Sequence, residues 1–132
     1  LTRRAQLAPA DRLHFLNMAA QAMRRILIDH ARARKRLKRG AGLQVELLDE
    51  IQTLMTDGAA DELVALDDAL DRFTTLNPRG ARVVELRFFA GLTLEETAST
   101  LDVSLKTVQR DWLVARAWLR KEIDGDLNAL DS

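Results

Sequence analysis

Apolar and polar positions follow a helical spacing most regularly in the last third of the chain. The spacing i, i+3, i+4 and i+7 places four side chains on one face of a short helix, namely Leu94, Thr97, Ala98 and Leu101. Thr93 and Glu96 are spaced as a capping box, in which each side chain accepts a backbone N–H of the other residue. We therefore expect a helix to begin at Thr93 and to bury this face.

A second helix is predicted after a tight turn. Ser104 can cap it, and a stripe at helical spacing should pack inward, formed by Val108, Trp112, Ala115 and Leu119. The opposite face carries side chains able to contact base edges and phosphates: Lys106, Gln109, Arg110, Leu113, Arg116 and Arg120. Two helices joined by a short turn predict a helix-turn-helix, which seats its second helix in the major groove of DNA.

Two residues depart from the usual pattern of this motif. Asp102 stands in the turn, where glycine would most easily adopt a left-handed conformation. Thr97 occupies a helix position that usually holds an aliphatic side chain. The same spacing also arises in ordinary helical bundles, where the polar face is merely solvated.

The N-terminal part is predicted to be one long helix. Asp11 can cap it, and glycines at positions 40 and 42 can end it. Its predicted apolar face consists of Phe15, Ala19, Ala22, Met23, Ile26, Leu27 and His30. Residues 41–60 show no clean period and include the turn signal Asp57-Gly58, so we expect a linker there.

The C-terminal part is predicted to be a unit of four helices over residues 61–123. Leu63, Leu66, Leu70 and Phe73 are spaced for one helix face. Asn77 and Pro78 supply the cap and first-turn proline of the next helix, which stops near Gly91. The helix-turn-helix follows, and residues 124–132 form an acidic tail. Because no strand pattern appears, the fold class is all-α.

Charge is sorted along the chain although the sum is zero. Residues 1–40 hold 11 Lys or Arg and 2 Asp or Glu, a net of +9. Residues 41–75 hold 1 and 9, a net of −8, and residues 76–123 hold 8 and 6, a net of +2. This sorting predicts a basic surface for a polyanion, an acidic connector and a nearly balanced domain with its cations on one helix.

Composition argues against several classes of protein. There is no cysteine, and the two histidines, His14 and His30, cannot build a metal site alone, so no metal or other cofactor is expected. Glu95 and Glu96 lie in a first helical turn, where the helix dipole favours negative charge, so catalysis is not expected either. No apolar run is long enough for a membrane span, and we expect a cytoplasmic protein.

Several strings in this sequence resemble a known family. They read NPR at 77–79, VVELRFFAGL at 83–92, EETA at 95–98, TV at 107–108, RDW at 110–112 and ARAWLR at 115–120. These strings resemble region four of bacterial extracytoplasmic-function (ECF) sigma factors. HF at 14–15 and AMRRILIDHARAR at 22–34 resemble the late part of region two. The resemblance therefore implies a partial region two over residues 1–40, with a complete region four over 61–123.

The resemblance implies a sigma subunit that binds core RNA polymerase and promoter DNA. Region four would read the minus-thirty-five element through Ser104, Lys106, Thr107, Gln109, Arg110, Leu113, Arg116 and Arg120. Region two would contact the minus-ten element and its backbone through Asp11, Arg12, His14, Arg24, Arg25, Arg32, Arg34, Lys35 and Arg36. An anti-sigma antagonist is a further candidate partner. The family begins region two with helices that dock on the polymerase clamp, and if the sigma interpretation holds we expect the genomic sequence upstream of Leu1 to encode them.

Two other functions are compatible with the residues. The chain could be a helix-turn-helix regulator that acts without polymerase, or a helical module that binds proteins. A simple regulator should carry a dimerising or ligand-binding element, and none is evident in the sequence. A protein-binding module would not need Lys106, Gln109 and Arg110 clustered on one outer face.

Overall fold

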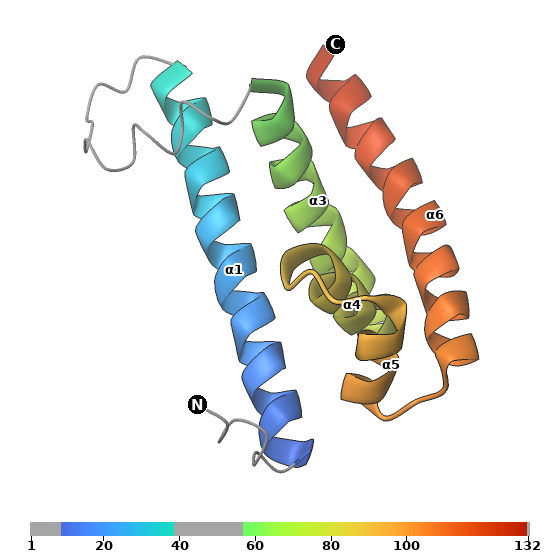
Figure 1. Ribbon diagram of the computed structural model, residues 1–132. Coiled ribbons are helices and arrows are strands. Elements are labelled where there is room, and N and C mark those ends of the chain that lie inside the picture. The colour runs from blue at the N-terminus through green and yellow to red at the C-terminus, as the bar shows by residue number, and fades with distance from the viewer. Residues whose placement is uncertain (1–8, 39–56, 132) are drawn as a thin grey trace.

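Helices account for all the regular secondary structure of residues 9–38 and 57–131, the part of the chain that the computed structural model describes (Figure 1). Three long helices lie side by side, α1 (Pro9–Lys38), α3 (Asp57–Leu76) and α6 (Leu105–Asp131), with α3 between the other two. The short helices α4 (Pro78–Val84) and α5 (Leu94–Leu101), together with the π turn η2 (Glu85–Phe89), pack near one end of this layer. The prediction of an all-α fold is confirmed.

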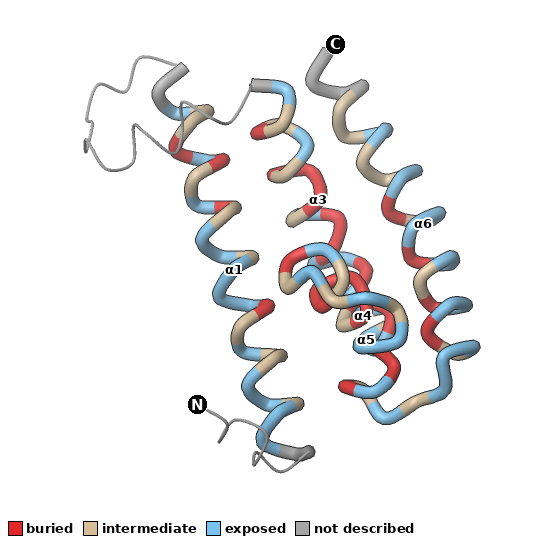
Figure 2. Tube along the Cα trace, viewed as in Figure 1, coloured by how far each residue is buried: buried red, intermediate tan, exposed pale blue. Residues whose placement is uncertain are grey.

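The main hydrophobic core lies where α3, α4, η2 and α6 meet. Its buried members are Leu66, Ala69, Leu70, Phe73, Ala81, Val84, Phe89, Ala115 and Leu119 (Figure 2). The ring of Phe73 lies 5.1 Å from that of Trp118, centroid to centroid, which joins α3 to α6. Full burial of one large apolar side chain contributes about 1.5–3 kcal/mol, so this core fixes the position of α6 on α3.

The predicted start of α4 is confirmed by its cap. The Asn77 side chain accepts a hydrogen bond from the backbone N–H of Gly80 at 2.9 Å, and Pro78 occupies the first helical turn. A Cβ atom at position 80 would lie 2.8 Å from Asn77 Nδ2 and 3.0 Å from a ring carbon of Phe73. Glycine is therefore needed there for the close approach of α4 to α3.

The predicted apolar face of α1 is wrong for most of its members, although Leu27 packs against the main core. Phe15, Met23 and Ile26 are 61%, 41% and 55% exposed, whereas small or aliphatic side chains on another face are buried: Ala20, Ile28, Ala31 and Ala33. The buried face also contains Arg24, so its most central contacts are polar. Three of the four buried apolar residues of this face are alanines, so the spacing of large apolar side chains did not predict it.

Three predicted boundaries also differ from the structure. Asp11 lies within the first turn of α1, which begins at Pro9, so Asp11 is not the cap. Asp57 and Gly58 form the first residues of α3 rather than a turn. The segment predicted as an acidic tail continues α6 as far as Asp131. Near the start of this segment, Arg72 of α3 binds Glu122 and Asp126 of α6 at 3.1 and 3.2 Å. The predicted end of α1 at positions 40 and 42 lies outside the described residues.

Candidate nucleic-acid interface

The two helices of the predicted motif are capped as the sequence indicates. Thr93 and Glu96 form the capping box, with Oγ1 of Thr93 accepting from Glu96 N–H at 3.0 Å and Glu96 Oε1 accepting from Thr93 N–H at 2.8 Å. Ser104 Oγ accepts from the N–H of Thr107 at 3.1 Å and caps α6. Asp102 adopts the left-handed conformation, with φ 56° and ψ 47°, that reverses the chain between α5 and α6.

Buried side chains fix the rotation of α6 about its own axis. Val108, Ala115 and Leu119 are 5% exposed or less, and Trp112 is half-buried between the main core and a second cluster. The second cluster joins Val108 to Val83 of α4 and Ala98 of α5. The predicted inward stripe is therefore confirmed. Ala98 has the small side chain that the close crossing of α5 and α6 requires.

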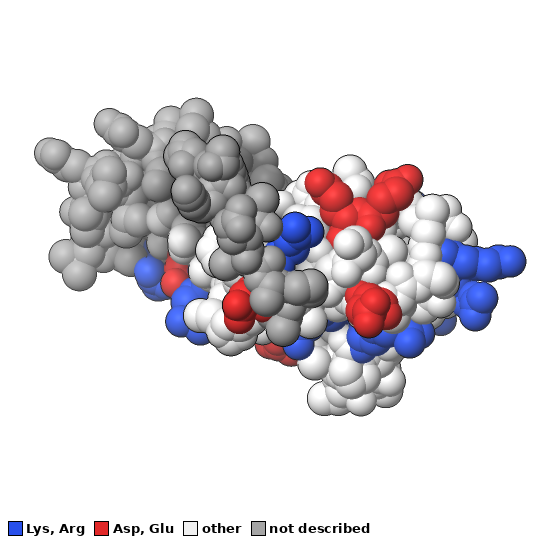
Figure 3. Space-filling model, turned by 60° about the horizontal axis from the view of Figure 1, so that its bottom comes forward, with Lys and Arg blue, Asp and Glu red and all other residues white. Residues whose placement is uncertain are grey.

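The opposite face of α6 is open to solvent. Lys106, Gln109, Arg110, Arg116 and Arg120 are all exposed, and Leu113 is exposed to 63%. In Figure 3, basic side chains gather at the edge of the molecule on which α6 lies. Ser104 is exposed, and Thr107 is half-buried with its hydroxyl 2.9 Å from that of Ser104. The predicted minus-thirty-five residues thus form one continuous surface at the beginning and middle of α6.

Cations from other helices support α6, and the sequence did not reveal them. Nε of Arg79 in α4 binds the buried Asp111 carboxylate of α6 at 2.6 Å, and this hydrogen bond raises the pKa of Arg79 above its ordinary value. Arg87 lies 4.7 Å from the ring centre of Trp112, and Arg116 lies 5.8 Å from it. The contacts of Arg79 and Arg87 join residues far apart in sequence, so spacing along one helix could not predict them, whereas Arg116 follows Trp112 by one turn of α6. Val114, 53% exposed beside Leu113, was also missed.

The second predicted set lies along α1, and the structure divides it between two environments. Asp11, Arg12, His14, Arg25 and Arg36 are exposed, whereas Arg34 is half-buried. Arg32 binds Asp67 and Asp68 at 3.2 and 3.3 Å, and Lys35 lies 3.4 Å from Asp61. The cations of α1 therefore do not form one free surface as those of α6 do.

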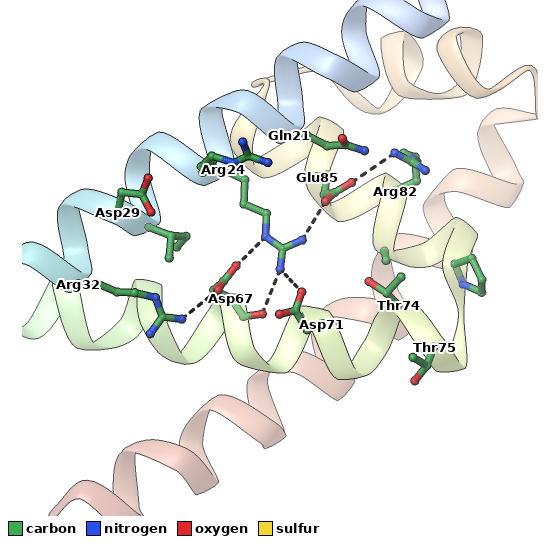
Figure 4. A pocket seen from close by; sticks show the side chains of 14 residues that line it. Gln21, Arg24, Asp29, Arg32, Asp67, Asp71, Thr74, Thr75, Arg82 and Glu85 are labelled. Atoms are coloured by element: carbon green, nitrogen blue, oxygen red, sulfur yellow. Dashed lines mark hydrogen bonds and ion pairs between the residues drawn. The ribbon is translucent and has the colours of Figure 1, made fainter.

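Arg24 is the most enclosed of these predicted DNA contacts. Its guanidinium donates to Asp67 Oδ1 at 2.8 Å, Asp71 Oδ1 at 2.7 Å and Glu85 Oε2 at 2.9 Å (Figure 4). Burial alone would lower the pKa of Arg24, but the charge of Asp67 and the three carboxylate hydrogen bonds raise it above its ordinary value. Contact between Arg24 and a phosphate requires the release of these carboxylates.

The acidic residues of the middle of the chain are also explained by this packing. Asp61, Asp67, Asp68 and Asp71 belong to α3 and face cations of α1, so much of the negative charge lies outside the predicted linker. The pocket of about 690 Å³ between these helices is lined by Arg24, Arg25, Arg32 and Arg82 together with Asp29, Asp67, Asp71 and Glu85. The charges balance within this pocket.

Within residues 9–38 and 57–131, no group of three or more His, Asp or Glu side chains could hold a metal ion. Over the same residues, no helix is both long and apolar enough to cross a bilayer.

The comparisons with known proteins give one match. A model of the ECF sigma factor family matches residues 3–125, a range that includes all of α1, α3, α4, η2 and α5 and most of α6. No curated protein and no solved structure matches the chain. The family match covers both predicted sets of DNA-contacting residues.

Proposed function

The chain belongs to the ECF sigma factor family, and we therefore propose that the exposed face of α6 reads the minus-thirty-five element of its promoters. Family membership makes it a sigma factor of transcription initiation, with core RNA polymerase and promoter DNA as partners. The observation that carries the proposal is the exposure of Lys106, Gln109 and Arg110 on the side of α6 opposite its buried stripe.

The side chains on this face suit the chemistry of the major groove. An arginine such as Arg110 can donate two hydrogen bonds to guanine, and a glutamine such as Gln109 can pair in the same way with adenine. Leu113 offers an apolar surface for a thymine methyl group. Arg116 and Arg120 follow Arg110 by 6 and 10 residues, about 9 and 15 Å along the helix, and suit phosphates at the rim of the groove.

The N-terminal helix is proposed to contact the minus-ten element. Arg12, Arg25 and Arg36 are exposed on α1 and can bind phosphates, while Asp11 and His14 lie near its start. Phosphate contacts of this kind position a protein on DNA without reading its sequence. Arg24, Arg32, Arg34 and Lys35 complete the proposed set.

An apolar groove between α3, η2 and α6 supports contact with core polymerase. The groove encloses about 520 Å³, with Leu66 and Leu119 buried in its wall and Phe88 exposed to 51%. Half-exposed aromatic side chains are common anchors of protein interfaces. We assign this groove to an apolar segment of the polymerase. An antagonist that covered it would compete with the polymerase.

The test of minus-thirty-five reading begins with transcription by purified core polymerase with and without the protein, and the start sites identify the promoter. Arg110→Ala is then expected to weaken binding of the holoenzyme to that promoter by about 1–3 kcal/mol if Arg110 reads a base. Lys121→Ala removes an exposed cation from the same helix outside the proposed set and serves as the control.

Binding is measured on the promoter and on a duplex whose minus-thirty-five sequence is scrambled. The Arg110→Ala loss should be confined to the cognate sequence, whereas Lys121→Ala should affect both duplexes alike. An equal loss from Arg110→Ala on both duplexes would make Arg110 a phosphate contact and refute its assignment as a reader of bases.

A further inference from the structure

Between positions 107 and 118, one flank of α6 beside its proposed DNA-reading face lacks a cation of its own. Four side chains at helical spacing form this flank, and none of them is basic: Thr107, Asp111, Val114 and Trp118. The proposed phosphate contacts Arg116 and Arg120 follow Asp111 by five and nine residues, which places both on the other flank. A helix in the major groove has a phosphate strand on each side. To one of these strands α6 alone would offer a carboxylate.

Helix α4, which packs against α6, supplies a cation on this flank (Figure 1). Arg79 lies in the first turn of α4, where Asn77 and Pro78 begin the helix. Its Nε donates to Oδ2 of Asp111 at 2.6 Å, and its Nη2 donates to Oδ1 of Asp111 at 3.2 Å. This contact fixes the guanidinium beside α6, because the planar fork of an arginine matches the two oxygens of a carboxylate.

Arg79 has hydrogen-bond donors to spare while it holds Asp111. The side chain of Arg79 is 54% exposed, whereas that of Asp111 is 10% exposed. A guanidinium carries several N–H donors, and the Asp111 carboxylate engages only those of Nε and Nη2. Among the residues that the structure describes, Nη1 of Arg79 has no hydrogen-bond partner. Arg79 can therefore bind a second anion without the release of the first.

We propose that Arg79 binds a backbone phosphate of the minus-thirty-five duplex while it stays paired with Asp111, an inference that rests on the proposed function of α6. Helix α4 thus contacts the DNA strand that the flank of Asp111 faces. The pairing removes the repulsion between Asp111 and that strand, and Nη1 of Arg79 adds a charge-assisted hydrogen bond. Because phosphates carry no base identity, Arg79 fixes the position of α6 in the groove and leaves its sequence preference unchanged.

The test measures how the binding of the holoenzyme to its promoter depends on salt. Each phosphate contact contributes about 0.9 to the slope of log affinity against log salt concentration. Arg79→Ala should therefore reduce the slope by about 0.9 and weaken binding about tenfold at low salt. The loss should be equal on the promoter and on a duplex with a scrambled minus-thirty-five sequence.

Arg72→Ala is the matched control. Arg72 also joins α6 to a neighbouring helix through carboxylates, those of Glu122 and Asp126, and its loss changes the net charge by the same amount. Glu122 follows Arg110 by 12 residues, or about 18 Å along the helix, so this ion pair lies away from the proposed DNA-reading face. The control should keep the salt slope of the parent protein.

A double variant separates the phosphate contact from the neutralisation of Asp111. Arg79→Ala leaves the Asp111 carboxylate unpaired and largely buried, whereas Arg79→Ala with Asp111→Ala removes both charges. If Arg79 binds a phosphate, the double variant keeps the reduced salt slope. Recovery of the parent's slope and affinity in the double variant would show that Arg79 only neutralises Asp111, and the proposal would be overturned.

Two results from Arg79→Ala would also overturn the proposal: an unchanged salt slope, or a loss of affinity confined to the cognate promoter. Arg79→Gln can still donate to Asp111 but carries no charge, so it should reduce the slope as Arg79→Ala does. It decides the question if the alanine variant does not fold.

Arg110→Ala in the same assay distinguishes failure of this inference from failure of the proposed function. A loss specific to the cognate promoter in Arg110→Ala, beside an unchanged slope in Arg79→Ala, refutes the phosphate contact and leaves base reading by α6 standing. Equal losses from Arg110→Ala on both duplexes, beside a reduced slope in Arg79→Ala, refute base reading by Arg110 and support the phosphate contact.

Discussion

At the scale of single residues, Asp102 and Thr97 show how this motif accommodates two unusual side chains. Thr97 is fully buried, and its hydroxyl donates to the backbone carbonyl of Thr93 at 2.8 Å, so its polar group is satisfied inside the core. Asp102 adopts the left-handed conformation that the sequence indicated for the turn, despite the steric cost of its Cβ. The backbone requirement was predictable because a helix-turn-helix needs a reversal at that point.

Asp102→Gly is expected to stabilise the protein. Relief of the left-handed strain outweighs the greater conformational entropy of glycine in the unfolded chain, for a net gain of about 0.5–1 kcal/mol. Chemical denaturation followed by circular dichroism measures this gain. Ser99→Gly, at an exposed helical position of α5, should instead cost about 0.5 kcal/mol. A loss of stability in both variants would show that Asp102 is not strained.

At the scale of the helices, the starts of α4, α5 and α6 and the buried stripe of α6 were predictable, whereas the buried face of α1 was not. Side chains that cap helices act over three residues, so Thr93 and Ser104 could be recognised from local sequence. The buried face of α1 could not be recognised from local sequence. Its central residue, Arg24, binds Asp67, Asp71 and Glu85, which follow it in the sequence by 43, 47 and 61 positions. The π turn at 85–89 was not predicted either, because the spacing of Val83, Leu86 and Phe89 fits a regular α-helix.

Thr93→Ala tests the contribution of the capping box to the reading surface. Loss of the hydroxyl leaves the N–H of Glu96 without its partner, and we expect a loss of about 1 kcal/mol in the free energy of unfolding. Glu95→Ala, in the same first turn and outside the capping box, should cost about 0.3 kcal/mol through the helix dipole. Denaturant titration of both variants compares them, and equal losses would contradict a specific role for the cap.

At the scale of the whole molecule, the sorted charge of the sequence has a structural explanation that the sequence alone could not supply. The basic segment was predicted to face a polyanion, and in the structure part of it faces the acidic residues of α3. The sign and location of the charges were evident from the sequence. Their pairing was not, because it depends on how α1 and α3 pack.

The groove between α3, η2 and α6 gives a prediction that concerns the complete holoenzyme. Phe88→Ala should weaken binding to core polymerase by about 1–2 kcal/mol, because it removes an exposed aromatic anchor. The variant also loses the edge contact between Phe88 and Phe89, which should cost about 1 kcal/mol of stability. Binding of labelled protein to core polymerase measures the effect.

Leu76→Ala is the control for the groove, since Leu76 is 66% exposed at the end of α3 and does not line it. The control should bind polymerase as the parent does. Unchanged polymerase binding by Phe88→Ala would remove the groove from the proposed interface.

The pairing of charges also determines which charged side chains of the protein attract a DNA duplex before contact. Within the described helices, Asp111 pairs with Arg79, Glu122 and Asp126 share Arg72, and cations of α1 pair with carboxylates of α3. Lys106, Arg110, Arg116 and Arg120 are exposed together on α6 and form no ion pair among the residues that the structure describes. A protein with no net charge can thus steer diffusional encounter with DNA, and the approach is already oriented toward one helix before any contact forms.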